Sequence, residues 1–107
     1  MNTTTFTGRL TKDPETKQAG ADTICELRVA VDSPDDHPTF VTVVTWNNLA
    51  STVIRYLTKG RQVAVTGRLS HDEWTTSDGE RRSRLYVTAR SIDFLDRPAE
   101  ADDQSEQ

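Results

Sequence analysis

Aromatic and arginine side chains carry the chemistry that this sequence offers. The aromatic candidates are Phe40, Trp46 and Trp74, and the arginine candidates are Arg28, Arg68, Arg81, Arg82 and Arg84. A flat ring can stack on a nucleobase, and a guanidinium can bind a phosphate. Since every nucleotide has a base face and a phosphate, the two kinds of side chain together could hold a nucleic-acid strand of any sequence.

Each of these side chains also has an ordinary structural explanation. Phe40 and Trp46 share one face of a predicted strand by parity, and periodicity alone favours a core position for both. Trp74 lies in a polar hairpin, where a core position is hard to arrange. Each arginine taken singly is equally well explained as a solvated surface charge. As a group beside Trp74, the arginines favour phosphate binding.

The elements that must position these residues are mostly strands. Alternating residues predict four strands, at residues 3–10, 23–31, 40–46 and 62–69. A long hairpin follows, with its two sides at residues 70–74 and 84–95 around an Asp78-Gly79 turn. Gly8 lies inside the first strand, where it suggests a bend or a close approach of another backbone.

One helix is predicted at residues 47–59. Its apolar stripe consists of Leu49, Ala50, Val53, Ile54 and Leu57. Asn47 or Asn48 is expected to cap the start, and Gly60 to follow the end. The fold class is therefore mostly β, a five-stranded OB-fold barrel with one α-helix between the third and fourth strands.

Length and charge favour one domain with a tail. The 107 residues suit a single domain at 1–95, followed by a short acidic disordered tail at 96–107. Residues 1–95 hold 12 basic and 12 acidic side chains, so the tail supplies the net charge of −4. A single cysteine, a polar start and the absence of a long apolar run predict a cytoplasmic protein without a membrane segment.

Six segments of the sequence match one known family in register. The segments are G-R-L-T-K-D-P-E at 8–15, L-R-V-A-V at 27–31, V-V-T-W-N-N-L-A at 43–50, Y-L-T-K-G at 56–60, V-T-G-R-L at 65–69 and W-T-T-S-D-G-E-R-R at 74–82. Together they resemble the bacterial single-stranded DNA-binding protein family, as a short, accessory-type member. The resemblance implies a nucleoid-associated OB-fold homotetramer that binds single-stranded DNA in replication, repair or recombination.

The resemblance also implies roles for particular residues. It makes Phe40, Trp46 and Trp74 base-stacking residues rather than core, and Thr42 stands where basic residues occur in the family. The expected binding surface consists of Arg28, Phe40, Thr42, Trp46, Arg68, Trp74, Arg81, Arg82 and Arg84. The expected oligomer interface is the first strand, with Thr3, Thr5 and Thr7. Tyr56 and Tyr86 are expected to pack rather than to bind.

Two of the chain's departures from the family bear on binding strength and on partners. His71-Asp72-Glu73 stands before Trp74 where basic residues are common, so we expect weaker and less salt-sensitive binding. The tail lacks a closing aromatic residue, so a solvating tail is expected rather than one that recruits repair or replication partners. The alternative function is an adaptor with a decayed nucleic-acid face, which acts through protein contacts or mixed oligomers.

Catalysis is not expected. The sequence has no G-x-S-x-G, H-E-x-x-H, C-x-x-C or G-x-x-x-x-G-K motif, so we predict no enzyme and no cofactor. His71-Asp72-Glu73 could in principle bind a metal ion. Neighbouring side chains of a strand point to opposite faces, however, so no metal site is predicted there.

Overall fold

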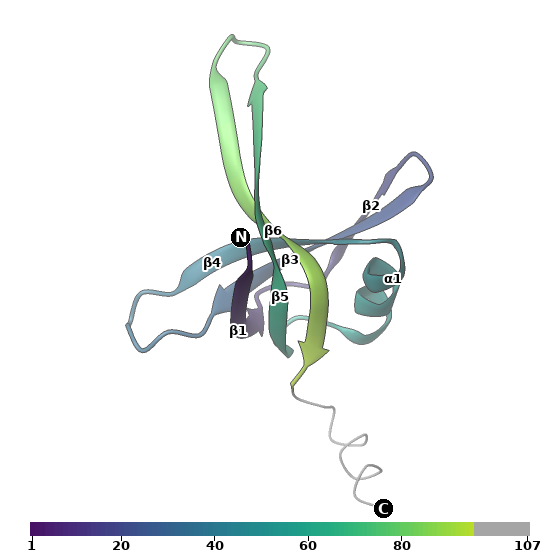
Figure 1. Cartoon of the computed structure of the whole chain (residues 1–107), viewed down its shortest axis with the longest axis vertical. Helices are drawn as coiled ribbons and strands as arrows, with labels where there is room; N and C mark the ends of the chain where they lie inside the picture. Colours follow the sequence, from purple (N-terminus) through teal and green to yellow (C-terminus); the bar gives the residue numbers. More distant parts are fainter. Residues whose placement is uncertain (96–107) are drawn as a thin grey trace, which may run out of the picture.

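The computed structural model describes residues 1–95, which form six strands and one helix. In chain order they are β1 (Thr4–Leu10), β2 (Glu15–Ala19), β3 (Asp22–Val31), β4 (Thr39–Trp46), α1 (Asn47–Tyr56), β5 (Gln62–Thr75) and β6 (Arg81–Phe94). The predicted tail at 96–107 lies outside the described residues. Figure 1 shows a central ring of strands from which three hairpins or loops project.

Five of the strands close into a barrel. The sheet order is β1-β5-β6-β4-β3-β2, and β1 also pairs with β3 through Gly8, Arg9 and Leu10. This additional pairing joins the two ends of the run β1-β5-β6-β4-β3. Within the ring only β4 and β6 are parallel. The predicted mostly β, five-stranded OB-fold barrel is therefore confirmed.

One strand outside the five-stranded ring, β2, was not expected. All five β2 residues are exposed, so the segment has no apolar alternation that could reveal a strand. It pairs with β3 outside the ring, from Glu15 opposite Glu26 to Ala19 opposite Asp22. The helix consequently lies between the fourth and fifth strands of the chain, where it connects β4 to β5.

The predicted asparagine cap of the helix is also wrong. Trp46 is the N-cap residue, and no side chain donates or accepts a capping hydrogen bond. Asn47 has a φ of 52°. Its Oδ1 accepts from the Thr23 backbone N–H at 3.0 Å, and its Nδ2 donates to Asp22 Oδ1 at 3.2 Å. Asn47 therefore ties the start of α1 to β3.

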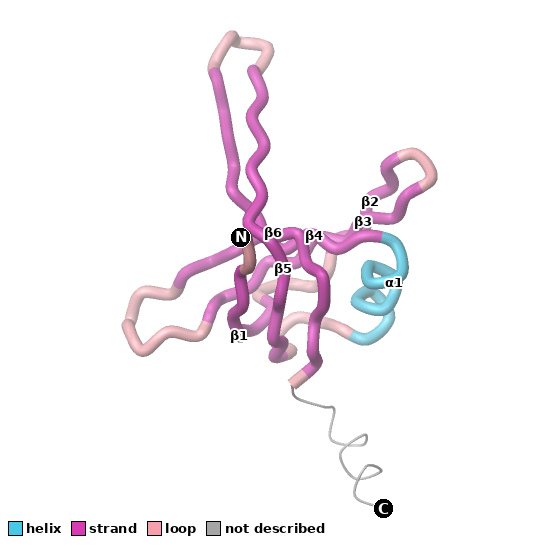
Figure 2. The backbone as a smooth tube through the Cα atoms, in the orientation of Figure 1, coloured by secondary structure: helices cyan, strands magenta, loops and turns pink. Residues whose placement is uncertain are grey.

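The core lies inside the ring and under the helix. The buried apolar residues are Leu10, Cys25, Leu27, Val29, Val43, Ala50, Val53, Leu57, Val63, Val65 and Val87. The helix covers the end of the barrel beside β3 (Figure 2). It ends at Tyr56, three residues before the predicted end, and Ile54 is exposed rather than part of the buried stripe.

Two glycines allow close contacts between strands. A Cβ on Gly8 would collide with the carbonyl oxygen of Ala30, which confirms the predicted close approach. A Cβ on Gly67 would collide with the carbonyl oxygen of Thr88. The β5–β6 register shifts beside Gly67, and such bulges increase strand twist. Past the last pairing of β6 with β4, at Val87, the hairpin leaves the barrel as a long projection, residues 70–86, which we call the arm (Figure 1).

Candidate nucleic-acid interface

Strand pairing brings most of the candidate residues to one side of the sheet. Directly opposed residues of paired strands point to the same face. Between β3 and β4, Arg28 opposes Thr42, Ala30 opposes Phe40 and Ile24 opposes Trp46. These side chains therefore share one face, which we call the outer face because the core residues of β3 point the other way.

The same face continues onto the arm. Val44 of β4 pairs with Thr88 of β6, and Thr88 in turn opposes Arg68. Further along, Asp72 opposes Arg84 and Trp74 opposes Arg82. The candidates on the outer face are Arg28, Phe40, Thr42, Trp46, Arg68, Trp74, Arg82 and Arg84. Arg81 opposes Thr75 and lies on the opposite face of the arm.

The three candidate aromatic rings are not part of the core. Phe40 is 48% exposed, Trp46 is 41% exposed and Trp74 is 47% exposed. Trp46 is the last residue of β4, where the chain turns into the helix, and Trp74 lies near the tip of the arm. Each of the three side chains therefore has surface that solvent, or a base, can reach.

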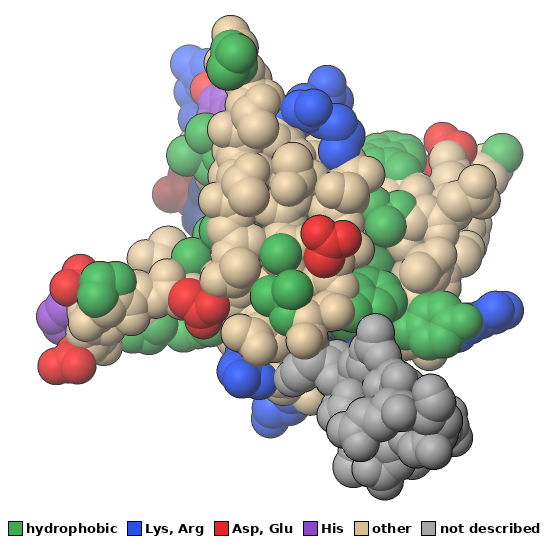
Figure 3. All heavy atoms as spheres, turned by 60° about the horizontal axis from the view of Figure 1, so that its bottom comes forward, with side chains coloured by type: hydrophobic (Ala, Val, Ile, Leu, Met, Phe, Trp, Pro, Cys, Tyr) green, Lys and Arg blue, Asp and Glu red, His purple; other side chains and the backbone are tan. Residues whose placement is uncertain are grey.

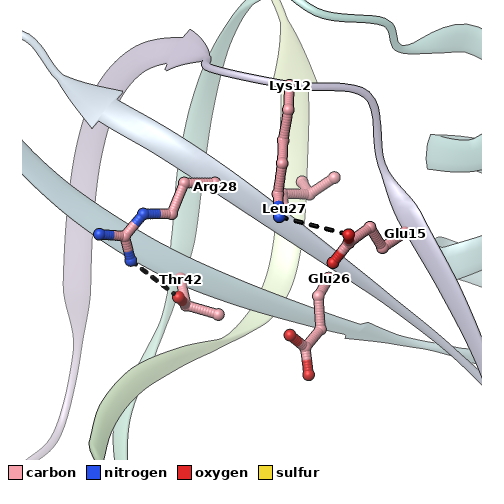
Figure 4. A pocket seen from close by; sticks show the side chains of 6 residues that line it. All are labelled: Lys12, Glu15, Glu26, Leu27, Arg28 and Thr42. Atoms are coloured by element: carbon pink, nitrogen blue, oxygen red, sulfur yellow. Dashed lines mark hydrogen bonds and ion pairs between the residues drawn. The ribbon is translucent and has the colours of Figure 1, made fainter.

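Arg28 is held against the sheet by two neighbours on β4. Its Nη1 donates to Thr42 Oγ1 at 3.1 Å, and its guanidinium carbon lies 5.6 Å from the centre of the Phe40 ring. Figure 4 shows Arg28 and Thr42 beside Glu26, and above them the ion pair of Lys12 with Glu15. Thr42 therefore orients a basic residue, although it carries no charge itself.

Arg84 occupies a cluster with three other side chains of the outer face. Its Nη2 lies 3.5 Å from Glu26 Oε2, and its Nε lies 3.7 Å from Asp72 Oδ2. Its guanidinium carbon is 4.9 Å from the centre of the Tyr86 ring. The Tyr86 hydroxyl donates to Asp72 Oδ1 at 3.2 Å. We call these four residues, Glu26, Asp72, Arg84 and Tyr86, the Arg84 cluster.

Two side chains have a raised pKa, Tyr86 on the outer face and Cys25 in the core. Burial, the hydrogen bond to Asp72 and the charge of Asp72 raise the pKa of the Tyr86 hydroxyl above its ordinary value. Burial is also the main reason that the pKa of Cys25 rises to about 11. Cys25 points into the core from β3, so its thiol belongs to the barrel rather than to the outer face.

The remaining arginines of the outer face differ in their partners. Arg82 Nη2 lies 3.0 Å from Glu80 Oε1 near the turn of the arm. Among residues 1–95, Arg28 and Arg68 form no ion pair. On the side of the molecule seen in Figure 3, Lys and Arg side chains form separate groups rather than a continuous band. The ion pairs of Arg82 and Arg84 show that carboxylates already bind part of the positive charge of the outer face.

Tyr86 and Glu26 were not among the residues expected at the interface. Tyr86 was expected to pack, yet it is only partly buried and shares the outer face with Arg84. Its parity with Arg82 and Arg84 on β6 could have indicated this position. Nothing in the sequence indicates that Glu26 meets Arg84, because the two residues are 58 positions apart.

The expected oligomer residues lie at the start of the chain. Thr3 precedes β1, and the first half of β1 pairs with β5 along one edge while its pairing with β3 begins at Gly8. Thr7 is already engaged, since its carbonyl accepts from the Asp32 N–H at 2.8 Å and its hydroxyl donates to Asp32 Oδ2 at 2.6 Å. The edge at Thr5 is therefore the more accessible part of this strand.

Residues 1–95 contain neither a candidate metal site nor a candidate membrane-spanning helix. No three His, Cys, Asp or Glu side chains in this range converge in a way that could hold a metal ion. Over the same range, no helix has the length and hydrophobicity to cross a membrane.

Sequence comparison identifies relatives over the whole barrel. The model of the Single-strand binding protein family matches residues 1–95. The single-stranded DNA-binding protein of Thermotoga maritima is 38% identical over 110 residues, which cover 94% of this chain and 78% of that protein. That of Clostridium perfringens is 36% identical over 100 residues, 90% of this chain and 67% of that protein. Single-stranded DNA-binding protein 1 of Clostridium acetobutylicum is 31% identical over 109 residues, 94% of this chain and 99% of that protein.

Proposed function

The chain belongs to the single-strand binding protein family, whose members bind DNA without catalysing a reaction, and from that premise we propose that its outer face binds single-stranded DNA of any sequence. The proposal gives it a protective role on exposed strands in replication, repair or recombination. The observation that carries it is the common face of three half-exposed aromatic rings and four arginines.

Binding rests on two kinds of contact. Bases stack on Phe40, Trp46 and Trp74, and each stacked base contributes about 1–3 kcal/mol whatever its identity. Phosphates bind the guanidinium groups of the outer face, with Arg28 and Arg68 free of carboxylate partners among residues 1–95. Neither contact reads a base edge, so the binding is independent of sequence.

Tryptophan fluorescence tests the proposal directly. Trp46 and Trp74 are the only tryptophans of the sequence, and both lie on the outer face. We expect their emission to fall in a saturable way when oligo(dT) is added to the full chain at low salt. Unchanged emission, together with no binding by a labelled oligonucleotide, would favour the adaptor function over DNA binding.

Single replacements assign the signal. Trp46→Phe and Trp74→Phe each leave one tryptophan as the reporter. Because phenylalanine still stacks on a base, each variant should still bind oligo(dT), and the remaining tryptophan should still be quenched. Duplex DNA at the same phosphate concentration should quench much less, since its bases are already stacked on one another. Equal quenching by duplex DNA would contradict the stacking mechanism.

We also propose self-association, with a homotetramer as the expected state. Within residues 1–95, no strand pairs with the second edge of the first half of β1, which includes Thr5. A groove of about 390 Å³ lies beside it, and Phe6, Val41, Leu69 and Leu85 contribute to its lining. An unpaired strand edge next to an apolar groove favours association with a second copy. Mass measurement in solution, with and without oligo(dT), tests this assembly.

A further inference from the structure

Arg84 is a basic residue of the outer face that carboxylates already bind. Glu26 reaches it from β3 and Asp72 reaches it from β5. We propose that these two carboxylates compete with DNA phosphate for Arg84, so that they limit the affinity of the protein for single-stranded DNA. This inference rests on the proposed function and concerns what sets the strength of binding at the same face.

The geometry of the two ion pairs suits displacement. The distances of 3.5 Å and 3.7 Å exceed the 2.7–2.9 Å that is typical of strong charge-assisted hydrogen bonds. Each carboxylate contacts Arg84 through one oxygen, and the Arg84 side chain is 39% exposed. A phosphate can offer two oxygens to the guanidinium fork and form a bidentate pair. The existing pairs are therefore exchangeable.

Each carboxylate keeps another hydrogen-bond or ion-pair partner when Arg84 moves away from it. The side chain of Glu26 is only 16% exposed, but its Oε2 also accepts from Lys17 Nζ at 3.3 Å. Asp72 is half exposed and keeps the hydrogen bond from the Tyr86 hydroxyl. Because both groups retain a partner, a phosphate can displace them without leaving a buried charge unpaired.

The same arrangement covers an aromatic ring. The guanidinium of Arg84 lies 4.9 Å from the centre of the Tyr86 ring, and Tyr86 is on the outer face. When Arg84 turns toward a phosphate, this ring face becomes accessible to a base. The Arg84 cluster therefore holds back one phosphate contact and one stacking surface in the free protein.

Removal of either carboxylate charge tests the competition. We expect Asp72→Asn and Glu26→Gln each to tighten oligo(dT) binding by about two- to fivefold, the range of a surface ion pair. Asp72→Asn is the safer variant, since its side chain is half exposed and the replacement has the same shape. Thermal unfolding verifies that both variants fold.

Glu73→Gln is the matched control. Glu73 is adjacent to Asp72 on the same strand, but it opposes Ser83 and lies on the other face of the arm. Its replacement removes the same charge, so any gain from a lower overall negative charge would appear here too. At physiological salt, where screening acts within about 8 Å, we expect no change. A gain equal to that of Asp72→Asn would overturn the inference.

The Arg84→Gln background separates competition from simple repulsion. If Asp72 acts by occupying Arg84, adding Asp72→Asn to Arg84→Gln should bring no further gain. If the gain persists, Asp72 repels DNA directly and the inference is overturned. Failure of the unaltered chain to bind oligo(dT) would overturn the proposed function itself, whereas binding without a gain in Asp72→Asn and Glu26→Gln would overturn this inference alone.

Discussion

The guanidinium of Arg28 lies over the ring of Phe40, with its central carbon 5.6 Å from the ring centre. The two residues are on neighbouring strands, because Arg28 opposes Thr42 and Phe40 is two positions before Thr42. A cation over an aromatic face is stabilising, more so as water is excluded. The pair presents a planar ring and, beside it, guanidinium N–H groups that can donate hydrogen bonds to a phosphate.

Loss of the Phe40 ring should weaken DNA binding without unfolding the protein. We expect Phe40→Ala to reduce the binding free energy for oligo(dT) by about 1–3 kcal/mol, the contribution of one stacked base. Its ring is 48% exposed, so the barrel should remain intact in thermal unfolding. Tyr56→Ala is the control, since Tyr56 is 53% exposed but lies on α1. An equal loss in both variants would argue against a stacking role.

Salt dependence should report which arginines contact phosphates. Each phosphate contact contributes about 0.7 to the slope of log affinity against log salt for single strands. We therefore expect Arg28→Ala and Arg68→Ala each to lower the slope by about that amount. Arg81→Ala should leave the slope unchanged, because Arg81 lies on the opposite face of the arm. Titrations with oligo(dT) at several salt concentrations measure this slope. An equal fall of the slope in Arg81→Ala would contradict the assignment of the phosphate contacts to the outer face.

Gly8 should be intolerant of any side chain. A Cβ at this position would collide with the Ala30 carbonyl oxygen and crowd a methyl group of Val29, so β1 and β3 would have to separate. We expect Gly8→Ala to lower the free energy of unfolding by about 1–3 kcal/mol in urea titrations. At Gly20 a Cβ would meet nothing within 4 Å, so Gly20→Ala should cost only the strain of a positive φ, about 1 kcal/mol.

Cys25 should make stability fall in alkaline solution. Burial raises its pKa from 9.0 to about 11, so the folded state holds the thiol proton more tightly than the unfolded state. This contribution is complete below pH 9 and is lost as the pH rises toward 11, by about 2–3 kcal/mol in total. The Cys25→Ala variant should lose less stability over this range, when both proteins are unfolded in urea at each pH.

The thiol should also resist modification in the folded protein. Cys25 is fully buried, and only the thiolate reacts with disulfide reagents. We expect no labelling at pH 8 until denaturant is added. Rapid labelling of the folded chain would show that this part of β3 opens readily.

Local sequence patterns predicted most element boundaries. The strands expected at 3–10, 23–31 and 40–46 correspond to β1, β3 and β4 within one residue at each end. Alternation succeeds there because one side of each strand faces the core, and it fails for β2 because both sides of β2 are exposed. The cap of α1 failed for a different reason, since Asn47 bonds to β3 instead of its own helix.

The candidate site was only partly predictable. Aromatic and arginine residues could be selected by type, and seven of these eight candidates share the outer face, as does Thr42. Parity puts Arg81 and Arg82 on opposite faces of a strand, but which of these faces joins the outer face depends on where the hairpin turns and on the register that follows. The partners of Arg84 were equally inaccessible, since Glu26 and Asp72 come from two other strands.

The sequence by itself determined the mostly β class, the strands of the barrel and the parity of side chains within each strand. These properties depend on neighbours along the chain, where a period of two separates one face from the other. Only the tertiary structure decided which strand faces join and which charges meet. Pairing register brings Trp46, Arg84 and Trp74 to one surface, and it also brings Glu26 and Asp72 to Arg84, because contacts between distant segments are set by the closed barrel as a whole.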